Sequence, residues 1–593
     1  MLNTGVRARW SALTATRSGE NALRSTRSTL STTRRVVCGA LALWFGVASF
    51  AADKLGASPL AEHVGAVDNS LLRIESGYDA LLLRVHLIRA ARESVELQTF
   101  IWTNDECGRL LLWELIEAAR RGVKVRLIVD QMFSEKDPAV MAFLATVSPN
   151  FELKHYRPAF ARVDPSLWQR LTAGALSFHG TNQRMHNKVM IVDGAVLVTG
   201  GRNVENTYFD HSTELNFRDR DVLATGPVVA TARKSFEEFW AYRHAVPSRE
   251  LRDVAREIAR GKFRRYDRRE DWDFGGLFGA LGREADDAVV VRERFAARLR
   301  PVRRAVFISD EPGKTRGWFG PAARLTRELR SALEQARSEI VMQTPYLVLS
   351  PAARRVFAKL REERPGLQFR ISSNSFASTD NLLAYSANYR LRGVYIEQLG
   401  LQVHEFKPRP AALPELFQQY RAMEERAAPR LAKGEQKRAP FLCVHAKSLV
   451  VDDRVAFVGS YNLDPRSERL NTEVGLIVED EEFARGLRAE IERDLAPENS
   501  WVIAQRDFPL GLDKVNSLIE GLVSITPFEV WPLRNTSSFD LRPGAQPVQP
   551  SHPEFHRRYL EVGSFPGTDG LLSQKEILTR LYKAVGAPLT PVI

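Results

Sequence analysis

Short β-rich runs and helical stretches alternate along the first half of the chain. Residues 95–102 (VELQTFIW) form a β-rich run, and 123–130 (VKVRLIVD) form a second run of this kind. Between them, residues 108–122 place apolar side chains at the spacing of an amphipathic helix. Strands that alternate with helices are typical of parallel or mixed sheets covered by helices. The pattern therefore predicts a β-α-β unit in an α/β domain.

The second half of the chain repeats this order. Strand, helix and strand are predicted again over residues 339–348, 351–366 and 367–374. The two copies are 245 residues apart at Gln98 and Gln343 but 259 apart at the motifs described below, which indicates a net insertion of 14 residues in the second copy. We place this insertion in the charged stretch 421–440 and expect a surface excursion there. An internal repeat of this length predicts two similar α/β/α domains.

The length of the chain agrees with two domains, because 593 residues exceed what one hydrophobic core usually organises. The predicted divisions are a basic leader at 1–53, a first domain at 70–250, an Arg-rich connecting segment at 251–305, a second domain at 306–530, and a linker with a C-terminal tail at 536–593. The linker prediction rests on three prolines between Asn535 and His552. No function follows from the tail.

The leader has the pattern of a targeting signal. Residues 1–35 carry seven Arg and one Glu, and residues 36–52 form an uncharged, mostly apolar run. This run is short for a spanning helix, and it ends in a small-x-small pattern, so either a cleaved signal or a signal anchor is predicted. A buried helix is the alternative. The basic flank would stay in the cytoplasm, which places the remaining chain at the bacterial inner membrane or on its periplasmic side.

Charge and cysteine content narrow the possible partners. The formal net charge is +12, but about half of this excess lies in the leader. The remainder suits an anionic lipid and is too weak to require a nucleic acid. Cys38, Cys107 and Cys443 are far apart in the sequence and form no C-x-x-C pair, so we interpret them as small apolar residues. No His, Asp and Glu cluster has metal-ligand spacing, and we expect neither a metal nor a cofactor.

The strongest signal is a motif that occurs once in each repeat. HNKVMIVDGAVLVTGGRN (186–203) aligns without a gap with HAKSLVVDDRVAFVGSYN (445–462). Five residue types fall at identical offsets: His186, Lys188, Asp193, Gly200 and Asn203 correspond to His445, Lys447, Asp452, Gly459 and Asn462. Accidental matches at all these positions in both copies of a repeat are improbable. The two motifs therefore predict one composite catalytic site.

These residue types suit the chemistry of a phosphodiester. One imidazole can attack phosphorus and the other can protonate the departing alcohol. Lys188 and Lys447 would balance the charge of the phosphate oxygens, and Asn203 and Asn462 would donate hydrogen bonds to them.

A carboxylate on the other imidazole nitrogen would fix the tautomer of each histidine. Glu473 is the candidate in the second half. In the first half we prefer Asp221 to Glu214, because the residues after Asp221 better match the strand after Glu473. Asp193 and Asp452 complete the two motifs and are included among the candidate catalytic residues. They close a strand and precede a turn, however, which favours a role in organising the backbone over direct chemistry.

At its duplicated H-x-K-x-x-x-x-D motif the sequence resembles the phospholipase D superfamily. The stretches GGRNVENTYF, FRDRDVLATGPVV, RISSNSFASTDN and GSYNLDPRSERLNTEVGLIVED are similar to the bacterial cardiolipin synthase branch, C-type, and the resemblance runs from about Leu72 to Trp501. It implies a two-domain pseudo-dimer with one interfacial site, a phosphohistidine intermediate, no metal, and phosphatidyl transfer to phosphatidylglycerol or another head group. We favour His186 as the nucleophile and a monomer as the oligomeric state.

Three other functions remain open at this point. A phospholipase that hydrolyses head groups would use the same residues, with water in place of the acceptor alcohol. A nuclease would also use them, but it would need a basic groove with stacking aromatic residues. A binding or scaffold protein would not need the two histidines.

Overall fold

The structure is a computed structural model, and it describes residues 55–134, 136–169, 172, 182–314, 323–507 and 535–568. The predicted leader and its apolar run at 36–52 lie outside these residues, as does the end of the tail. Within the described part of the chain, no helix has both the length and the apolar character needed to cross a bilayer.

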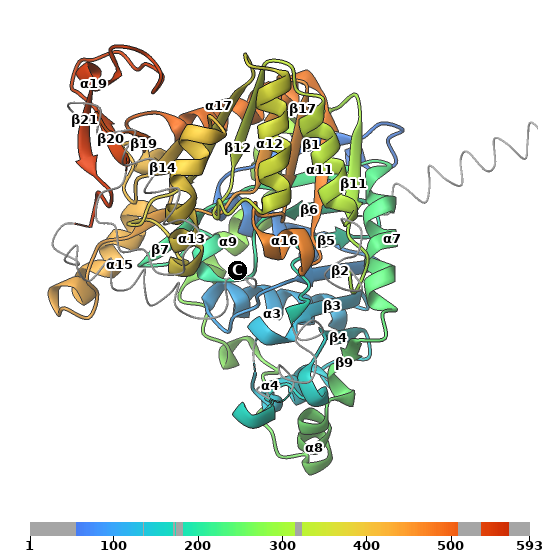
Figure 1. Ribbon diagram of the computed structural model, residues 1–593. Coiled ribbons are helices and arrows are strands. Elements are labelled where there is room, and N and C mark those ends of the chain that lie inside the picture. Colours follow the sequence, from blue (N-terminus) through green and yellow to red (C-terminus); the bar gives the residue numbers. More distant parts are fainter. Residues whose placement is uncertain are drawn as a thin grey trace, which may run out of the picture. The chain divides into compact units, whose positions relative to one another are not determined.

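The first repeat folds around a nine-stranded mixed sheet (Figure 1). In spatial order its strands are β10 (Arg300–Pro301), β1 (Ser70–Ile74), β8 (Asp221–Thr225), β6 (Val196–Gly200), β5 (Val189–Val192), β2 (Ser94–Thr99), β3 (Lys124–Asp130), β4 (Phe151–Tyr156) and β9 (Ala245–Pro247). The neighbours β2, β3 and β4 are parallel, as the predicted β-α-β unit requires. Every residue of β2 is buried, because helices or the second domain cover both faces.

Helices on the two faces of this sheet belong to different cores. On one face lie α2 (Gly77–Ala90), α3 (Glu106–Arg120) and α4 (Pro138–Leu144). The connecting segment adds α8 (Arg252–Arg260), α9 (Leu277–Asp286) and α10 (Ala288–Arg294) to this face, where Leu281 and Val291 join the core. The opposite face packs with α7 (Val228–Trp240) against the second domain, since Ile191 and Phe236 share a cluster with Val450 and Leu487.

The second repeat forms a ten-stranded sheet with the same central order. Its strands are β11 (Ala305–Ser309), β18 (Val474–Glu479), β17 (Val455–Gly459), β16 (Ser448–Val451), β12 (Glu339–Gln343), β13 (Gln368–Asn374), β14 (Gln402–Phe406), β19 (Ser500–Gln505), β20 (Thr536–Leu541) and β21 (Tyr559–Gly563). Its helices are α11 (Arg324–Glu334), α12 (Pro351–Glu363), α13 (Leu382–Gly393), α14 (Leu413–Leu416), α15 (Tyr420–Ala432), α16 (Pro465–Arg469), α17 (Glu481–Leu495) and α19 (Phe555–Arg558). The predicted α/β fold with two similar domains is confirmed.

Two predicted segments differ from expectation. The stretch interpreted as a linker begins with β20, which pairs with β19, and β21 then extends the sheet further. The three prolines all follow Leu541, so they end the strand instead of preventing it. The charged insertion 421–440 contains most of α15, which contacts the first domain through Arg426 to Glu106 and Arg430 to Glu214. Most of its residues are exposed, as predicted for a surface excursion, but it also forms a contact between the domains that was not predicted.

Candidate active site

Two short parallel pairings join the repeats at the motifs. β15 (Phe441–Val444), which directly precedes His445, pairs with β7 (Leu215–Arg218) of the first repeat. In the reciprocal place, Met185 pairs with Thr472 of the second repeat. Backbone hydrogen bonds continue both pairings, from His445 N to Arg218 O at 2.8 Å and from His186 N to Thr472 O at 3.0 Å. Each histidine is therefore set beside a segment of the opposite repeat.

This arrangement gives each histidine a carboxylate from the other half of the chain. His186 Nδ1 lies 2.8 Å from Glu473 Oε2, and His445 Nδ1 lies 2.6 Å from Asp219 Oδ2. All four side chains are buried. Glu473 is thus correctly placed beside a histidine, although it is the histidine of the first repeat.

The prediction of Asp221 as the second carboxylate is wrong. Asp221 is paired with Gly200 between β8 and β6, just as Gly475 is paired with Gly459, so the counterpart of Glu473 is Asp219. The chain between Asn203 and Asp219 is five residues longer than the chain between Asn462 and Glu473, and this difference hides the equivalence in the sequence.

The other two acidic candidates in the first repeat are engaged elsewhere. Asp221 accepts a hydrogen bond from Arg84 at 2.9 Å in the core. Glu214 pairs with Arg430 near the surface, at 2.8 Å. Neither carboxylate is bonded to a histidine.

Both motif lysines are buried beside the histidines. Lys188 Nζ donates to the carbonyl oxygen of His186 at 2.8 Å, and Lys447 Nζ lies 2.7 Å from His445 Nδ1. Burial, which disfavours an isolated ammonium group, lowers the pKa of Lys188 well below its usual value and that of Lys447 to about 8. The negative charge of an arriving phosphate would favour the protonated form of both side chains.

The histidines and their carboxylates differ in protonation. Burial, together with the nearby lysines, lowers the pKa of His186 well below 6.5 and that of His445 to about 4. Burial also raises the pKa of Glu473 to about 7. For Asp219 burial acts in the same direction, but the charges of His445 and Lys447 outweigh it and hold its pKa well below the usual value. His445 therefore faces the more firmly ionised carboxylate.

The two motif asparagines have different surroundings. Asn203 accepts a hydrogen bond from Ile101 N at 3.2 Å and donates to the Tyr208 hydroxyl at 2.8 Å. Asn462 is buried, and its Oδ1 atom has no hydrogen-bond partner among the described residues. The NH₂ group of Asn203 has two hydrogens and donates one to Tyr208, so the second can form the predicted phosphate contact.

Asp193 and Asp452 do not join the histidines, so their inclusion among the catalytic residues is wrong. Each lies at the far end of the strand that follows its motif lysine, with φ near 50°. The Asp193 carboxylate accepts from the amides of Arg92, Glu93 and Ser94, and Asp452 accepts from the corresponding amides before β12. Their role is to hold the loops that begin β2 and β12, as the turn position suggested.

Aromatic side chains that the motif analysis missed line the histidines. The Phe100 ring lies 4.9 Å from His186, and Phe217 and Tyr208 lie 4.7 and 5.1 Å from His445. The Tyr208 hydroxyl is 3.4 Å from His445 Nε2. Tyr208 lies in the longer first-repeat loop, which has no aligned partner in the second repeat, and repeat comparison could not find it. Among the described residues there is no group of three or more His, Cys, Asp or Glu arranged to hold a metal.

Comparison with known proteins adds an independent observation. The family described as “Cardiolipin synthase, PLD-like domain” matches residues 85–240 and 329–495, so that each match contains one motif. The chain is 29% identical to an uncharacterized protein of Helicobacter pylori, over 77% of this chain and 83% of that protein. It is 28% identical to cardiolipin synthase C of Escherichia coli, over 70% of this chain and 82% of that protein. The solved phosphatidylserine synthase of Haemophilus influenzae aligns with a TM-score of 0.48 and 14% identity, over 73% of this chain and 87% of that one.

Proposed function

The chain belongs to the PLD-like family of the cardiolipin synthases, and from this premise we propose that it is a phosphatidyltransferase that acts on phospholipids through a phosphohistidine. The observation that carries the proposal is the pair of buried histidines, each hydrogen-bonded to a carboxylate of the opposite repeat. One site built from both repeats needs no second chain, and a monomer remains our prediction.

In the proposed first step, His186 is the nucleophile. Its Nδ1 proton is directed to Glu473, which leaves the lone pair on Nε2 free to attack phosphorus. The low pKa of His186 keeps the imidazole neutral and nucleophilic. As the Nε2–P bond forms, the bond from phosphorus to the head-group oxygen breaks, and the head group leaves as an alcohol. Lys188 and Lys447 balance the charge that develops on the phosphate oxygens.

His445 is the acid and base of this scheme. Its Nδ1 faces the ionised Asp219, which stabilises an imidazolium, while Nε2 is directed to the side of Tyr208. The imidazolium protonates the departing oxygen in the first step. In the second step neutral His445 takes the proton of the incoming lipid alcohol, whose oxygen attacks phosphorus and releases His186.

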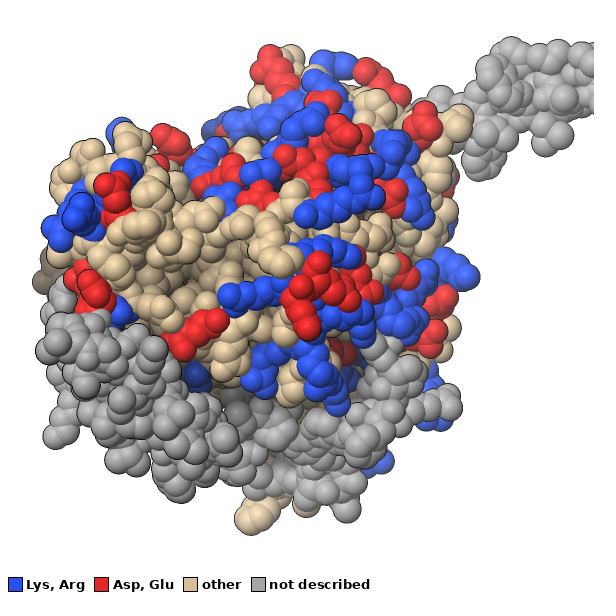
Figure 2. Space-filling model, turned by 45° about the horizontal axis from the view of Figure 1, so that its top comes forward, with Lys and Arg blue, Asp and Glu red and all other residues tan. Residues whose placement is uncertain are grey.

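Hydrolysis is the second candidate, because water can replace the acceptor alcohol with no change of residues. The phenyl rings of Phe100 and Phe217 beside the two histidines favour a lipid alcohol, since they reduce the space for ordered water. A nuclease is disfavoured. The net positive charge outside the leader is small, and on the one face shown in Figure 2 acidic and basic side chains are interspersed.

The proposal is tested with full-length protein and its His186→Ala and His445→Ala variants, incubated with phosphatidylglycerol in detergent micelles. Mass spectrometry of the lipids should find cardiolipin and released glycerol with the wild type and neither with the variants. Phosphatidic acid alone would instead support the hydrolase. A phosphohistidine trapped by rapid denaturation at alkaline pH, where the P–N bond survives, should map to His186, and its absence from both histidines would contradict the covalent step.

We further propose that the basic leader and the apolar run at 36–52 hold the site at the periplasmic face of the inner membrane. The support is the charge pattern alone, with seven Arg before the run. Alkaline phosphatase fused after the described residues should be active in a bacterial host. Removal of the leader should abolish the phosphatase activity, and an inactive full-length fusion would contradict this topology.

A further inference from the structure

An apolar cavity lies between α11 and α12 in the second domain. Its volume is about 310 Å³, and its walls come from both helices and from the strands below them. They include Leu329, Val356, Phe357, Met342 and Phe457. An apolar cavity of about 150 Å³ is enough to hold a benzene molecule, and 310 Å³ accommodates on the order of ten groups of the size of a methylene. The cavity thus suits a chain, not a single small group.

The corresponding helices of the first domain are more deeply buried than α11 and α12. Ten of the 14 residues of α2 and 11 of the 15 residues of α3 are buried, compared with four of 11 in α11 and two of 13 in α12. The same α/β plan therefore has a closed helical layer in one repeat and an open one in the other. Closure in the first domain comes partly from α9, whose Ala285 accepts a hydrogen bond from His86 of α2.

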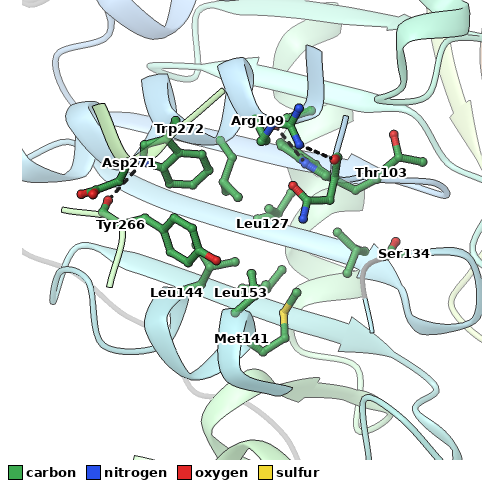
Figure 3. Close-up of a pocket in the computed structure, with 16 residues that line it drawn as sticks. Thr103, Arg109, Leu127, Ser134, Met141, Leu144, Leu153, Tyr266, Asp271 and Trp272 are labelled. Carbon is green, nitrogen blue, oxygen red and sulfur yellow. Dashed lines mark hydrogen bonds between the residues drawn. The ribbon is translucent and has the colours of Figure 1, made fainter. Parts of the chain in front are cut away.

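The first domain has a different pocket, between α3, α4 and the connecting segment (Figure 3). Tyr266 and Trp272 face Met141 and Leu144 across it. Its volume is about 70 Å³, which is room for about two methylene-sized groups. Of these two pockets, only the second-domain cavity is large enough to hold an acyl chain.

This cavity also adjoins the active site. Tyr461 and Leu463 form part of its wall, and they flank Asn462, whose Oδ1 atom is buried without a partner in the described structure. Adjacent Cα atoms are about 3.8 Å apart, so the cavity and the predicted phosphate contact are separated by one stretch of backbone. α11 and α12 lie beside each other over the second sheet in Figure 1.

The charge around the cavity fits an anionic lipid. α11 and α12 together carry seven Arg and Lys against four Glu, and Arg327 and Arg330 contribute to the cavity wall. Arginine side chains bind phosphate oxygens well, and an apolar space beside them matches the two ends of a phospholipid. When the phosphate of a lipid enters a buried site, part of its acyl chain leaves the membrane. Without an apolar cavity to cover it, this part of the chain would be exposed to water.

We propose that the space between α11 and α12 binds an acyl chain of the phospholipid substrate and thereby sets chain-length preference. The proposal rests on the proposed phosphatidyl transfer for its substrate, and it adds a binding site outside the catalytic residues. Ala353 and Val356 of α12 are the wall positions at which filling the cavity is most direct, because both are only partly buried.

A matched pair of variants tests the site. Ala353→Trp fills the cavity, whereas Ala358→Trp adds the same indole to an exposed position of the same helix. Phosphatidylglycerols with four- and six-carbon chains are compared below their micelle concentration. A buried methylene contributes about fourfold in affinity, so kcat/KM should rise about 16-fold with two more carbons in the wild type and in Ala358→Trp. Ala353→Trp should lose most of this rise.

If kcat/KM rises equally with chain length in Ala353→Trp and Ala358→Trp, the proposal is wrong. If Ala353→Trp does not give the circular dichroism spectrum of the wild type, Ala353→Leu provides a smaller filling. A second measurement is independent of turnover: phosphatidylglycerol with a diazirine near the end of one chain is photolysed with full-length protein. Peptides that contain α11 or α12 should carry the label, and labelling that avoids both helices would exclude the site. Labelled helices without any phosphatidyl transfer would instead refute the proposed function and retain the binding site.

Discussion

Replacement of Asp219 by asparagine is the sharpest test of the site. The carboxylate lies 2.6 Å from His445 Nδ1 and is ionised, whereas an amide of the same shape can direct its NH₂ group at that nitrogen. The imidazole would then carry its proton on Nε2, which is the wrong tautomer for a base. In a serine protease triad the equivalent change costs on the order of 10⁴-fold in kcat. We expect about 10³- to 10⁴-fold here, or about 4 to 5.5 kcal/mol of transition-state stabilisation.

The pH dependence gives the same test a second readout. The Asp219 charge raises the pKa of His445, against the larger effect of burial, which lowers it to about 4. Without this charge the pKa of His445 falls further, so the imidazolium that protonates the leaving oxygen is lost at a lower pH. The basic limb of the rate profile for the first step should therefore move to lower pH in Asp219→Asn.

The assay is release of glycerol from phosphatidylglycerol in micelles, measured across pH for the wild type, Asp219→Asn and Glu214→Gln. Glu214 is the matched control, because it is an exposed acid of the same loop whose partner is Arg430. It should retain activity within about tenfold of the wild type. Activity of Asp219→Asn within tenfold of the wild type, with a large loss in Asp221→Asn, would refute the reasoning and restore the assignment made from the sequence.

Three further predictions concern other parts of the site. Glu473 has its pKa raised from 4.5 to about 7, so its contribution to stability is fully present below pH 4.5 and is lost as pH rises through 7; this amounts to about 3 kcal/mol. Glu473→Gln should remove that pH dependence in urea unfolding at pH 5 and 8, and an unchanged dependence would contradict the shift. Asp193→Asn should lower the free energy of unfolding by about 1 to 3 kcal/mol, because three loop amides lose part of their acceptor. The kcat of the folded variant should stay within tenfold of the wild type. A large loss of kcat at unchanged stability would instead show that Asp193 is a catalytic residue. Gly201→Ala would place a Cβ atom 2.1 Å from Asp219 Oδ1 and should lower kcat at least tenfold. The control Gly366→Ala, whose Cβ atom meets open space, should leave kcat unchanged. Equal effects of the two variants on kcat would show that the steric contact with Asp219 does not matter.

Much of the architecture was readable from local patterns. The period of the apolar residues predicted β2, α3 and β3 and their counterparts β12, α12 and β13, since each pattern depends on neighbours within one element. The error at β20 shows the limit of such patterns. A short strand at the edge of a sheet is defined by its pairing partner, and the prolines that follow it suggested a linker.

The motif histidines and lysines were found because their spacing is short and repeated. Tyr208 and Phe217 were not found, because their positions depend on a loop that only one repeat contains. The space between α11 and α12 was also invisible, since the sequences of α3 and α12 both predict an amphipathic helix. Whether such a helix is covered depends on which other elements pack on it.

The sequence by itself determined the repeat, the α/β plan, and the two motifs that place His186 and His445 just before corresponding strands. Only the tertiary structure decided which carboxylate serves which histidine. His186 and Glu473 are 287 residues apart, and His445 and Asp219 are 226 apart. Their pairing follows from the parallel contact of β7 with β15 and its single-bridge counterpart. Both contacts join different repeats and are too short to leave a periodic pattern in the sequence.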